Sequence, residues 1–92
     1  MTGSKHVTVL DAFWHVVARG LASRGVGDHM GDSDHLGICM PEVRTEARRL
    51  GVQLPAGKPL LDAVRTCPRL VRISAVRSRI RHSTVRCWVF KK

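Results

Sequence analysis

Apolar residues in the first quarter of the chain recur with helical spacing. They fall at i, i+3, i+4, i+7, i+8 and i+11, at Leu10, Phe13, Trp14, Val17, Ala18 and Leu21. This is the apolar stripe of an amphipathic helix. Thr8 and Asp11 approximate a capping box at its start, while Arg24 and Gly25 suit the last turn and the C′ position. The pattern predicts a helix over residues 9–24 with both aromatic residues in the core.

Residues 25–37 follow neither a helical nor a strand period. The segment holds four glycines and five acidic or histidine residues, a composition typical of loops. Leu36, Ile38 and Met40 then alternate with other residues, which indicates a short strand. We therefore expect a flexible loop over residues 25–37 that leads into a short strand.

Two short helices are predicted next. Pro41 is suited to the first turn of a helix, and the apolar positions that follow predict a helix over residues 41–50 that ends at Gly51. Residues 52–57 read as a turn. Pro59 opens a second helix over residues 58–67, which Pro68 terminates.

The last third of the chain predicts two strands joined by a basic hairpin. Val71, Ile73 and Ala75 alternate with polar residues, and so do the positions from Val85 to Phe90. In the second strand we expect Val85, Cys87 and Val89 to point inward and Arg86, Trp88 and Phe90 to point outward. The polar segment 77–83 between the strands suits a hairpin tip.

This element order predicts a single α+β domain over residues 1–92. Helix, short strand, two helices and a two-stranded basic wing are the anatomy of a winged helix, and the run from Met40 to Lys92 resembles winged-helix nucleic-acid-binding domains. Residues 60–73, which run from Leu60-Leu61 through Pro68 to Val71 and Ile73, are similar to the end of the LOTUS (OST-HTH) branch of that fold. The LOTUS resemblance implies contacts with RNA and with helicase partners.

Charge is segregated along the chain. The whole sequence carries +9, whereas residues 1–40 carry −1 and residues 41–92 carry +10. A basic half on a small domain points to a polyanionic partner, most often nucleic acid.

The resemblance places candidate base contacts on the helix at 58–67, because the second helix of a winged helix-turn-helix enters the major groove. The exposed positions would include Lys58, Arg65 and Arg69. Arg65 is the preferred candidate, since a guanidinium pairs with guanine in bidentate fashion. The alternative is that Arg65 forms an ion pair with Asp62 on the same helix face.

The wing supplies the candidate phosphate contacts. Arg77, Arg79 and Arg81 alternate, so they would line one side of an extended segment, and phosphate fits a guanidinium fork well. Further candidates are Arg72 and Arg86 at the base of the wing, His82 at its tip, and Arg44 and Arg48 on the helix at 41–50. On that helix, Glu46 can form an ion pair with Arg49.

We expect no metal ion and no cofactor. The loop carries carboxylate and imidazole groups that suit zinc, nickel or manganese: Asp28, His29, Asp32, Asp34 and His35. A glycine-rich loop does not hold such ligands in a fixed geometry. Cys39, Cys67 and Cys87 are odd in number and far apart, which is typical of buried, reduced thiols in an intracellular protein rather than of a zinc site.

The expected function is binding of double-stranded DNA. No motif of a known enzyme class is present, so we expect no enzymatic activity. No apolar run approaches the roughly 18 residues of a membrane span. One alternative is an RNA-binding module of LOTUS or ribosome-associated type. Another is a protein–protein module or homodimer that uses an exposed patch of Trp88, Phe90 and Val76.

Overall fold

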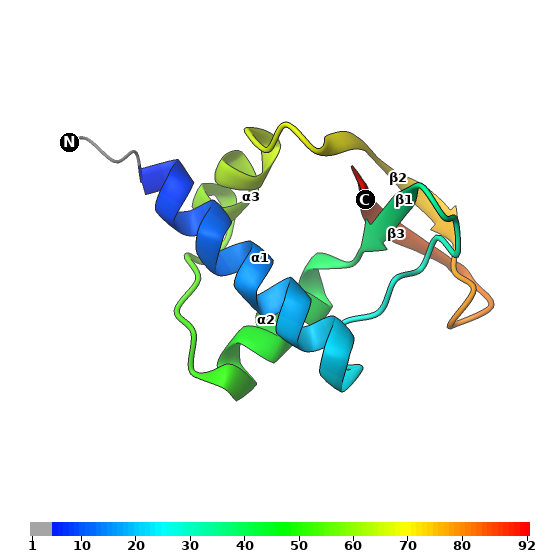
Figure 1. Cartoon of the computed structure of the whole chain (residues 1–92), viewed down its shortest axis with the longest axis horizontal. Helices are drawn as coiled ribbons and strands as arrows, with labels where there is room; N and C mark the ends of the chain where they lie inside the picture. Colours follow the sequence, from blue (N-terminus) through cyan, green and yellow to red (C-terminus); the bar gives the residue numbers. More distant parts are fainter. Residues whose placement is uncertain (1–4) are drawn as a thin grey trace.

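The computed structural model describes residues 5–92, with side chains from Thr8 onward. Within these residues it is an α+β domain of three helices and one three-stranded antiparallel sheet. The helices gather at one end of the molecule and the hairpin projects at the other (Figure 1). The elements are α1 (Lys5–Ser23), β1 (His35–Ile38), α2 (Met40–Leu50), α3 (Lys58–Arg65), β2 (Leu70–Arg77) and β3 (Thr84–Lys91). In the described part of the chain, every helix is too short or too polar to cross a membrane.

Helix α1 starts earlier than the sequence predicts. Because it begins at Lys5, Thr8 lies inside the helix and is not its N-cap. Val16 is buried, whereas Ala18 is exposed. The apolar stripe is therefore turned slightly from the predicted one.

The end of α1 also differs from the prediction. Arg24 takes the left-handed conformation after the helix (φ 67°), the role expected of Gly25. Gly25 instead leaves room for the carboxylate of Glu46, which a Cβ at position 25 would displace.

Helices α2 and α3 follow the local sequence closely. Both carry proline in the first turn, and Gly51 caps α2 in the left-handed conformation (φ 74°), as predicted. Helix α3 ends at Arg65, two residues earlier than expected, and Thr66 follows it as the C-cap residue.

The predicted pair between Glu46 and Arg49 is present and also reaches α1. Arg49 Nε donates to Glu46 Oε1 at 2.9 Å, and Ser23 Oγ donates to Glu46 Oε2 at 3.0 Å. The hydrogen bond from Arg49 is the main cause of a lowered pKa at Glu46, and the Ser23 bond adds to it. Glu46 therefore fastens the end of α1 to α2.

The sheet has strand order β1-β3-β2, with β3 in the centre. Trp88 and Phe90 of β3 pack against the helices with Phe13 and Val17 of α1. Phe90 is fully buried and its ring lies 5.9 Å from that of Phe13. The main core therefore lies between the helices and one face of the sheet.

The second face of the sheet is also covered. Met30, from the segment between α1 and β1, packs with Cys39, Cys87 and Val89 in a smaller apolar cluster. Residues 87–90 of β3 are consequently buried on both faces of the sheet. The expectation that Trp88 and Phe90 point outward and form an exposed patch with Val76 is wrong, because they face the helices while Val76 lies half-buried on the opposite face.

The irregular segment ends at Asp34, because residues 35–37 belong to β1. Composition predicts a flexible loop, but specific bonds hold residues 25–34. Asp28 Oδ1 accepts the N–H groups of Met30 and Gly37, each at 3.0 Å. At the C-terminus, Lys92 Nζ donates to the carbonyl of Asp32 at 3.0 Å. The segment is thereby fixed against the sheet.

Candidate nucleic-acid interface

The hairpin tip is a compact turn rather than an extended segment. The N–H of Ser78 donates to the carbonyl of Ser83 at 2.8 Å, and that of His82 donates to Ser78 O at 3.0 Å. His82 is exposed and has a positive φ of 56°. Because residues 79–81 form a turn, the alternation that would align the wing arginines does not apply.

Two of the three wing arginines contact other segments of the protein. Arg79 Nε donates to the carbonyl of Asp28 at 2.9 Å. Arg81 Nη2 donates to Glu42 Oε2 at 2.7 Å. Arg77 is exposed at the end of β2. The prediction that Arg77, Arg79 and Arg81 line one side of the wing is therefore wrong in its geometry.

A different set of arginines shares one side of the hairpin. Arg77 and Arg86 lie on the same sheet face as Trp88, because cross-strand partners share a face and successive residues alternate. Arg81, Arg86 and Trp88 line a groove of about 330 Å³ at the start of α2. Arg65 of α3 lies over Trp88, with Cζ 5.5 Å from the ring centroid. We call these five residues the α3–hairpin face.

The exposed side of α3 carries compensated charge. Arg65 Nη1 lies 3.5 Å from Asp62 Oδ1, and Lys58 Nζ lies 4.0 Å from Asp62 Oδ2. The ion pair expected as the alternative for Arg65 is thus present. The Arg65 side chain nevertheless remains 52% exposed. Its guanidinium is therefore accessible, while Asp62 and the indole of Trp88 hold it in place.

Arg44 and Arg48 lie elsewhere. They line a groove of about 540 Å³ between α2 and residues 51–56. Arg48 is exposed, whereas Nε of Arg44 is buried without a hydrogen-bond partner among the residues described. The structure does not join this groove to the α3–hairpin face.

Arg69 and Arg72 also point to other surroundings. Arg69 Cζ lies 4.2 Å from the ring centroid of Trp14, and its Nε donates to the carbonyl of Lys91. Arg72 lies on the sheet face opposite to Trp88, where its Nε donates to Ser74 Oγ at 3.2 Å. The Arg69 contacts link α1 and β3, whereas the Arg72 contact stays within β2.

A buried polar network lies behind the hairpin, and sequence reasoning missed it. His29 is fully buried. Its Nδ1 lies 2.6 Å from Ser78 Oγ, and its Nε2 lies 3.0 Å from Glu42 Oε2. The partners of His29 are 49 and 13 residues away along the chain, so no local spacing could reveal the network.

The Ser78–His29–Glu42 chain resembles a hydrolytic triad in composition only. Ser78 Oγ already accepts the N–H groups of Ile80 and Arg81 at 3.1 and 3.0 Å. Its hydroxyl proton is therefore left to donate to Nδ1, while Nε2–H of His29 donates to Glu42. Ser78 is 1% exposed, so its oxygen is a structural acceptor and not an accessible nucleophile.

Two thiols adjoin this network. Cys39 Sγ and Cys87 Sγ are 3.9 Å apart, and burial raises the pKa of the Cys39 thiol. Burial, together with the adjacent Cys39, raises the pKa of Cys87 to about 12. Both thiols are consequently protonated at neutral pH and are poor nucleophiles.

The acidic groups of the loop do not gather into one cluster. Asp28 bonds to backbone N–H groups, and its Oδ2 lies 3.6 Å from Lys92 Nζ. Asp32 pairs with His35 at 3.0 Å. The backbone N–H of Asp34 and then the His35 side chain lower the pKa of Asp32. These residues brace the loop and the C-terminus.

Comparisons of the chain with protein-family models, with curated proteins and with solved structures gave no match in any of the three.

Proposed function

We propose that this chain is a nucleic-acid-binding module of winged-helix type that binds duplex DNA through the α3–hairpin face. The observation that carries the proposal is the contact of Arg65 with Trp88, which lines the same groove as Arg81 and Arg86. This contact brings the cations of α3 and of the hairpin onto one side of the molecule. The element order and the strand order β1-β3-β2 are compatible with a winged helix.

Uncompensated charge supports an anionic partner. Each carboxylate after residue 40 is engaged in an ion pair: Glu42 with Arg81, Glu46 with Arg49, and Asp62 with Lys58 and Arg65. In the described structure, none of these acids is paired with Arg77 or Arg86. Bound phosphates would relieve the repulsion among such cations, since guanidinium groups form bidentate bonds with phosphate oxygens.

In this proposal the exposed cations of the hairpin and those of α3 contact different parts of the DNA. Arg77 and Arg86 are exposed on the hairpin and suit backbone phosphates, which set affinity and register without reading sequence. Lys58 and Arg65 are exposed on α3, the helix that would enter the major groove. Asp62 lies between them and offsets part of their charge, so most of the affinity comes from the hairpin.

The aromatic residues favour a duplex over a single strand. Single-stranded nucleic acids are bound by stacking bases on exposed aromatic rings. Here Phe13 and Phe90 are fully buried, Trp88 is 5% exposed, and Trp14 is half-buried beneath Arg69. With Tyr absent from the sequence, none of the Phe and Trp rings is fully exposed as a stacking platform.

The test is a salt titration with matched charge variants. Fluorescence anisotropy would measure binding of labelled random duplex DNA, duplex RNA and single-stranded DNA to the full chain, to Arg77→Gln, to Arg86→Gln and to Arg19→Gln. Arg19 is exposed on α1 and serves as the control of equal charge. Each hairpin substitution should reduce the salt slope on duplex DNA by about 1, and the control should keep the parent slope.

The outcomes separate the candidate functions. Tightest binding to duplex DNA, weakened by the two hairpin variants but not by the control, supports the proposal. Tighter binding to duplex RNA would favour the alternative RNA-binding module. Equal loss in all three variants would indicate diffuse attraction without a defined face, and the absence of binding at low salt would overturn the proposal.

A further inference from the structure

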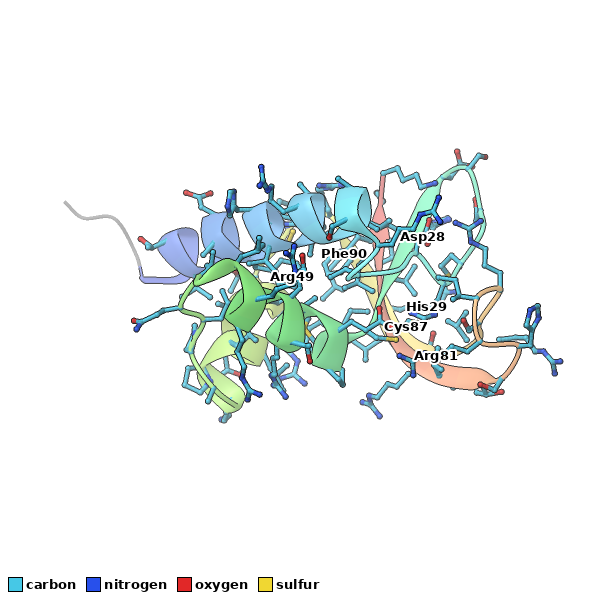
Figure 2. All side chains as sticks on the ribbon, turned by 90° about the horizontal axis from the view of Figure 1, so that it is seen from below. Asp28, His29, Arg49, Arg81, Cys87 and Phe90 are labelled. Atoms are coloured by element: carbon cyan, nitrogen blue, oxygen red, sulfur yellow. The ribbon has the colours of Figure 1, made fainter. Side chains whose placement is uncertain are left out.

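Four potential metal ligands converge behind the hairpin, although they come from three separate segments. His29 belongs to the loop before β1, Cys39 and Glu42 lie at the start of α2, and Cys87 lies in β3. Figure 2 shows His29 and Cys87 near Arg81, at the junction of the loop, α2 and the hairpin. We propose that His29, Cys39 and Glu42 bind a zinc ion and that Cys87 supplies the fourth ligand.

The first three ligand atoms already form a compact group. One ligand atom each of His29, Cys39 and Glu42 lies within 4.8 Å of the others. Zinc bonds of about 2.0 Å to nitrogen or oxygen and about 2.3 Å to sulfur give tetrahedral edges of roughly 3.3–3.8 Å. His29 Nε2 and Glu42 Oε1 are 3.2 Å apart, which matches a nitrogen–oxygen edge.

Cys87 stands at the distance of a second thiolate ligand. Its Sγ lies 3.9 Å from Cys39 Sγ, close to the sulfur–sulfur edge of about 3.8 Å that follows from zinc–thiolate bonds. Cys87 is not part of the compact group of three. It therefore reaches the ion by a small side-chain adjustment and closes the site.

The surroundings are those of a structural metal centre. A metal-bound histidine holds its second nitrogen in a hydrogen bond, and a bound carboxylate is likewise oriented by a neighbour. Ser78 Oγ lies 2.6 Å from His29 Nδ1, and Arg81 Nη2 donates to Glu42 Oε2 at 2.7 Å. His29 and Cys87 are fully buried, which favours a closed four-ligand site over an open catalytic one.

Proton and charge balance are satisfied within the network. On binding, the S–H protons of Cys39 and Cys87 leave to solvent. His29 changes tautomer: it loses the proton on Nε2 and takes one on Nδ1. Ser78 Oγ then accepts the Nδ1–H in place of the longer of its two backbone bonds, the one from Ile80 N–H at 3.1 Å, and turns its own proton away from the ring. Two thiolates, one carboxylate and Zn²⁺ leave one formal negative charge, which the guanidinium of Arg81 offsets through Glu42.

The donor set selects the class of metal. Thiolate and imidazole ligands favour zinc over magnesium, calcium or manganese, which prefer oxygen. Cys39 and Glu42 line grooves on two sides of the cluster, so an ion has a path inward. Bound zinc would lock the loop, the start of α2 and the hairpin turn together.

The experiment is metal titration of the full chain, stripped with a chelator and kept reduced. Zn²⁺ would be titrated against a chromophoric competitor, and Co²⁺ would be followed by its absorption. We expect one ion per chain, the Co²⁺ bands of tetrahedral thiolate coordination, and a thermal midpoint at least about 5 °C higher with zinc. Glu42→Gln and Cys39→Ser should each weaken zinc binding at least 100-fold, and Ser78→Ala about 10–100-fold.

Two control variants identify the site. Cys67 is buried in the main core and not in the smaller cluster of Cys39 and Cys87, so Cys67→Ser should retain zinc affinity and the Co²⁺ spectrum. His35→Asn removes the half-buried His35–Asp32 pair and should also leave both unchanged. Cys87→Ser should weaken the thiolate band and lower zinc affinity without abolishing it.

The outcomes are unambiguous. If Cys39→Ser fails to fold by circular dichroism, Glu42→Gln and the Co²⁺ spectrum still decide the question. No zinc binding at micromolar concentration would overturn the proposal. So would binding that survives Glu42→Gln or is lost in His35→Asn, or a Cys39–Cys87 disulfide that excludes metal under reducing conditions.

Discussion

Arg65 lies over Trp88, with Cζ 5.5 Å from the centroid of the indole ring. Trp88 is 5% exposed and belongs to the main core. Trp88 therefore connects the interior of the domain to the α3–hairpin face. Its fluorescence should change when a ligand binds to that face.

A fluorescence experiment uses that position. Trp14→Phe leaves Trp88 as the only tryptophan, and phenylalanine preserves the aromatic contacts of residue 14 with Phe13 and Phe90. Addition of duplex DNA should change the emission of this variant, because a phosphate that binds Arg65 alters the field at the indole. Trp88→Phe, which retains Trp14, should respond much less. An equal response in both variants would place the bound DNA elsewhere.

Phe90 should be a major source of stability. It is fully buried and contacts both Phe13 and Trp14. Phe90→Ala should lower the free energy of unfolding by about 3–5 kcal/mol, because it leaves a cavity where β3 packs against α1. Val71→Ala is the control, since Val71 is 42% exposed at a bulge in β2, and its effect should stay within about 0.5 kcal/mol. Urea denaturation measures both, and similar losses would contradict the assigned core.

Glu46 should make stability depend on pH in the acidic range. Its pKa in the folded state is lowered from 4.5 by Arg49 and Ser23, so the ionised form favours the folded state. This contribution is fully present above the unfolded pKa and is lost as the pH falls through the folded value. The difference in unfolding free energy between the parent and Glu46→Gln should shrink as the pH is lowered from about 6 to about 3.

Arg49→Gln provides the check on that mechanism. It removes the main cause of the shift while keeping the carboxylate of Glu46. Its stability should therefore vary less with pH than that of the parent. A parent-like profile in Arg49→Gln would show that another group governs the acidic range.

The end of α1 contains a strained position. Arg24 has a φ of 67°, where a side chain costs roughly 1–2 kcal/mol and glycine costs little. Arg24→Gly should raise the free energy of unfolding by up to about 1 kcal/mol, after the larger entropy of glycine in the unfolded chain is subtracted. Arg19→Gly removes the same charge from inside α1 and should destabilise by about 1 kcal/mol. Denaturation curves should show opposite signs, and a loss in both variants would contradict the strain.

Local sequence predicted the helical part of the fold well. The proline in the first turn and Gly51 at the end fixed the limits of α2 to within a residue, since helix initiation and capping depend on groups within about one turn. The pair of Glu46 and Arg49 was predictable for the same reason, because residues three positions apart are neighbours on a helix. The α+β class followed from the order of these elements.

Strand alternation gave the two faces of β3 but not their environments. Cys87 and Trp88 do lie on opposite faces, yet both are buried, because Met30 and its loop cover the second face. Alternation separates the two sides of a strand. It does not reveal which distant segments cover each side: the helices bury the Trp88 side, which was expected to be exposed, and the loop with Met30 covers the Cys87 side.

The sequence by itself determined the helices, the strands and the excess of positive charge after residue 40, because periodicity, capping and charge depend on residues close together in the chain. Only the tertiary structure decided which arginines share a surface and which are held by Glu42 or Asp28. It also brought His29 to Glu42 and Cys39 to Cys87. Those contacts join residues up to 51 positions apart, and they exist only once the packing of loop, helix and hairpin has closed the distance.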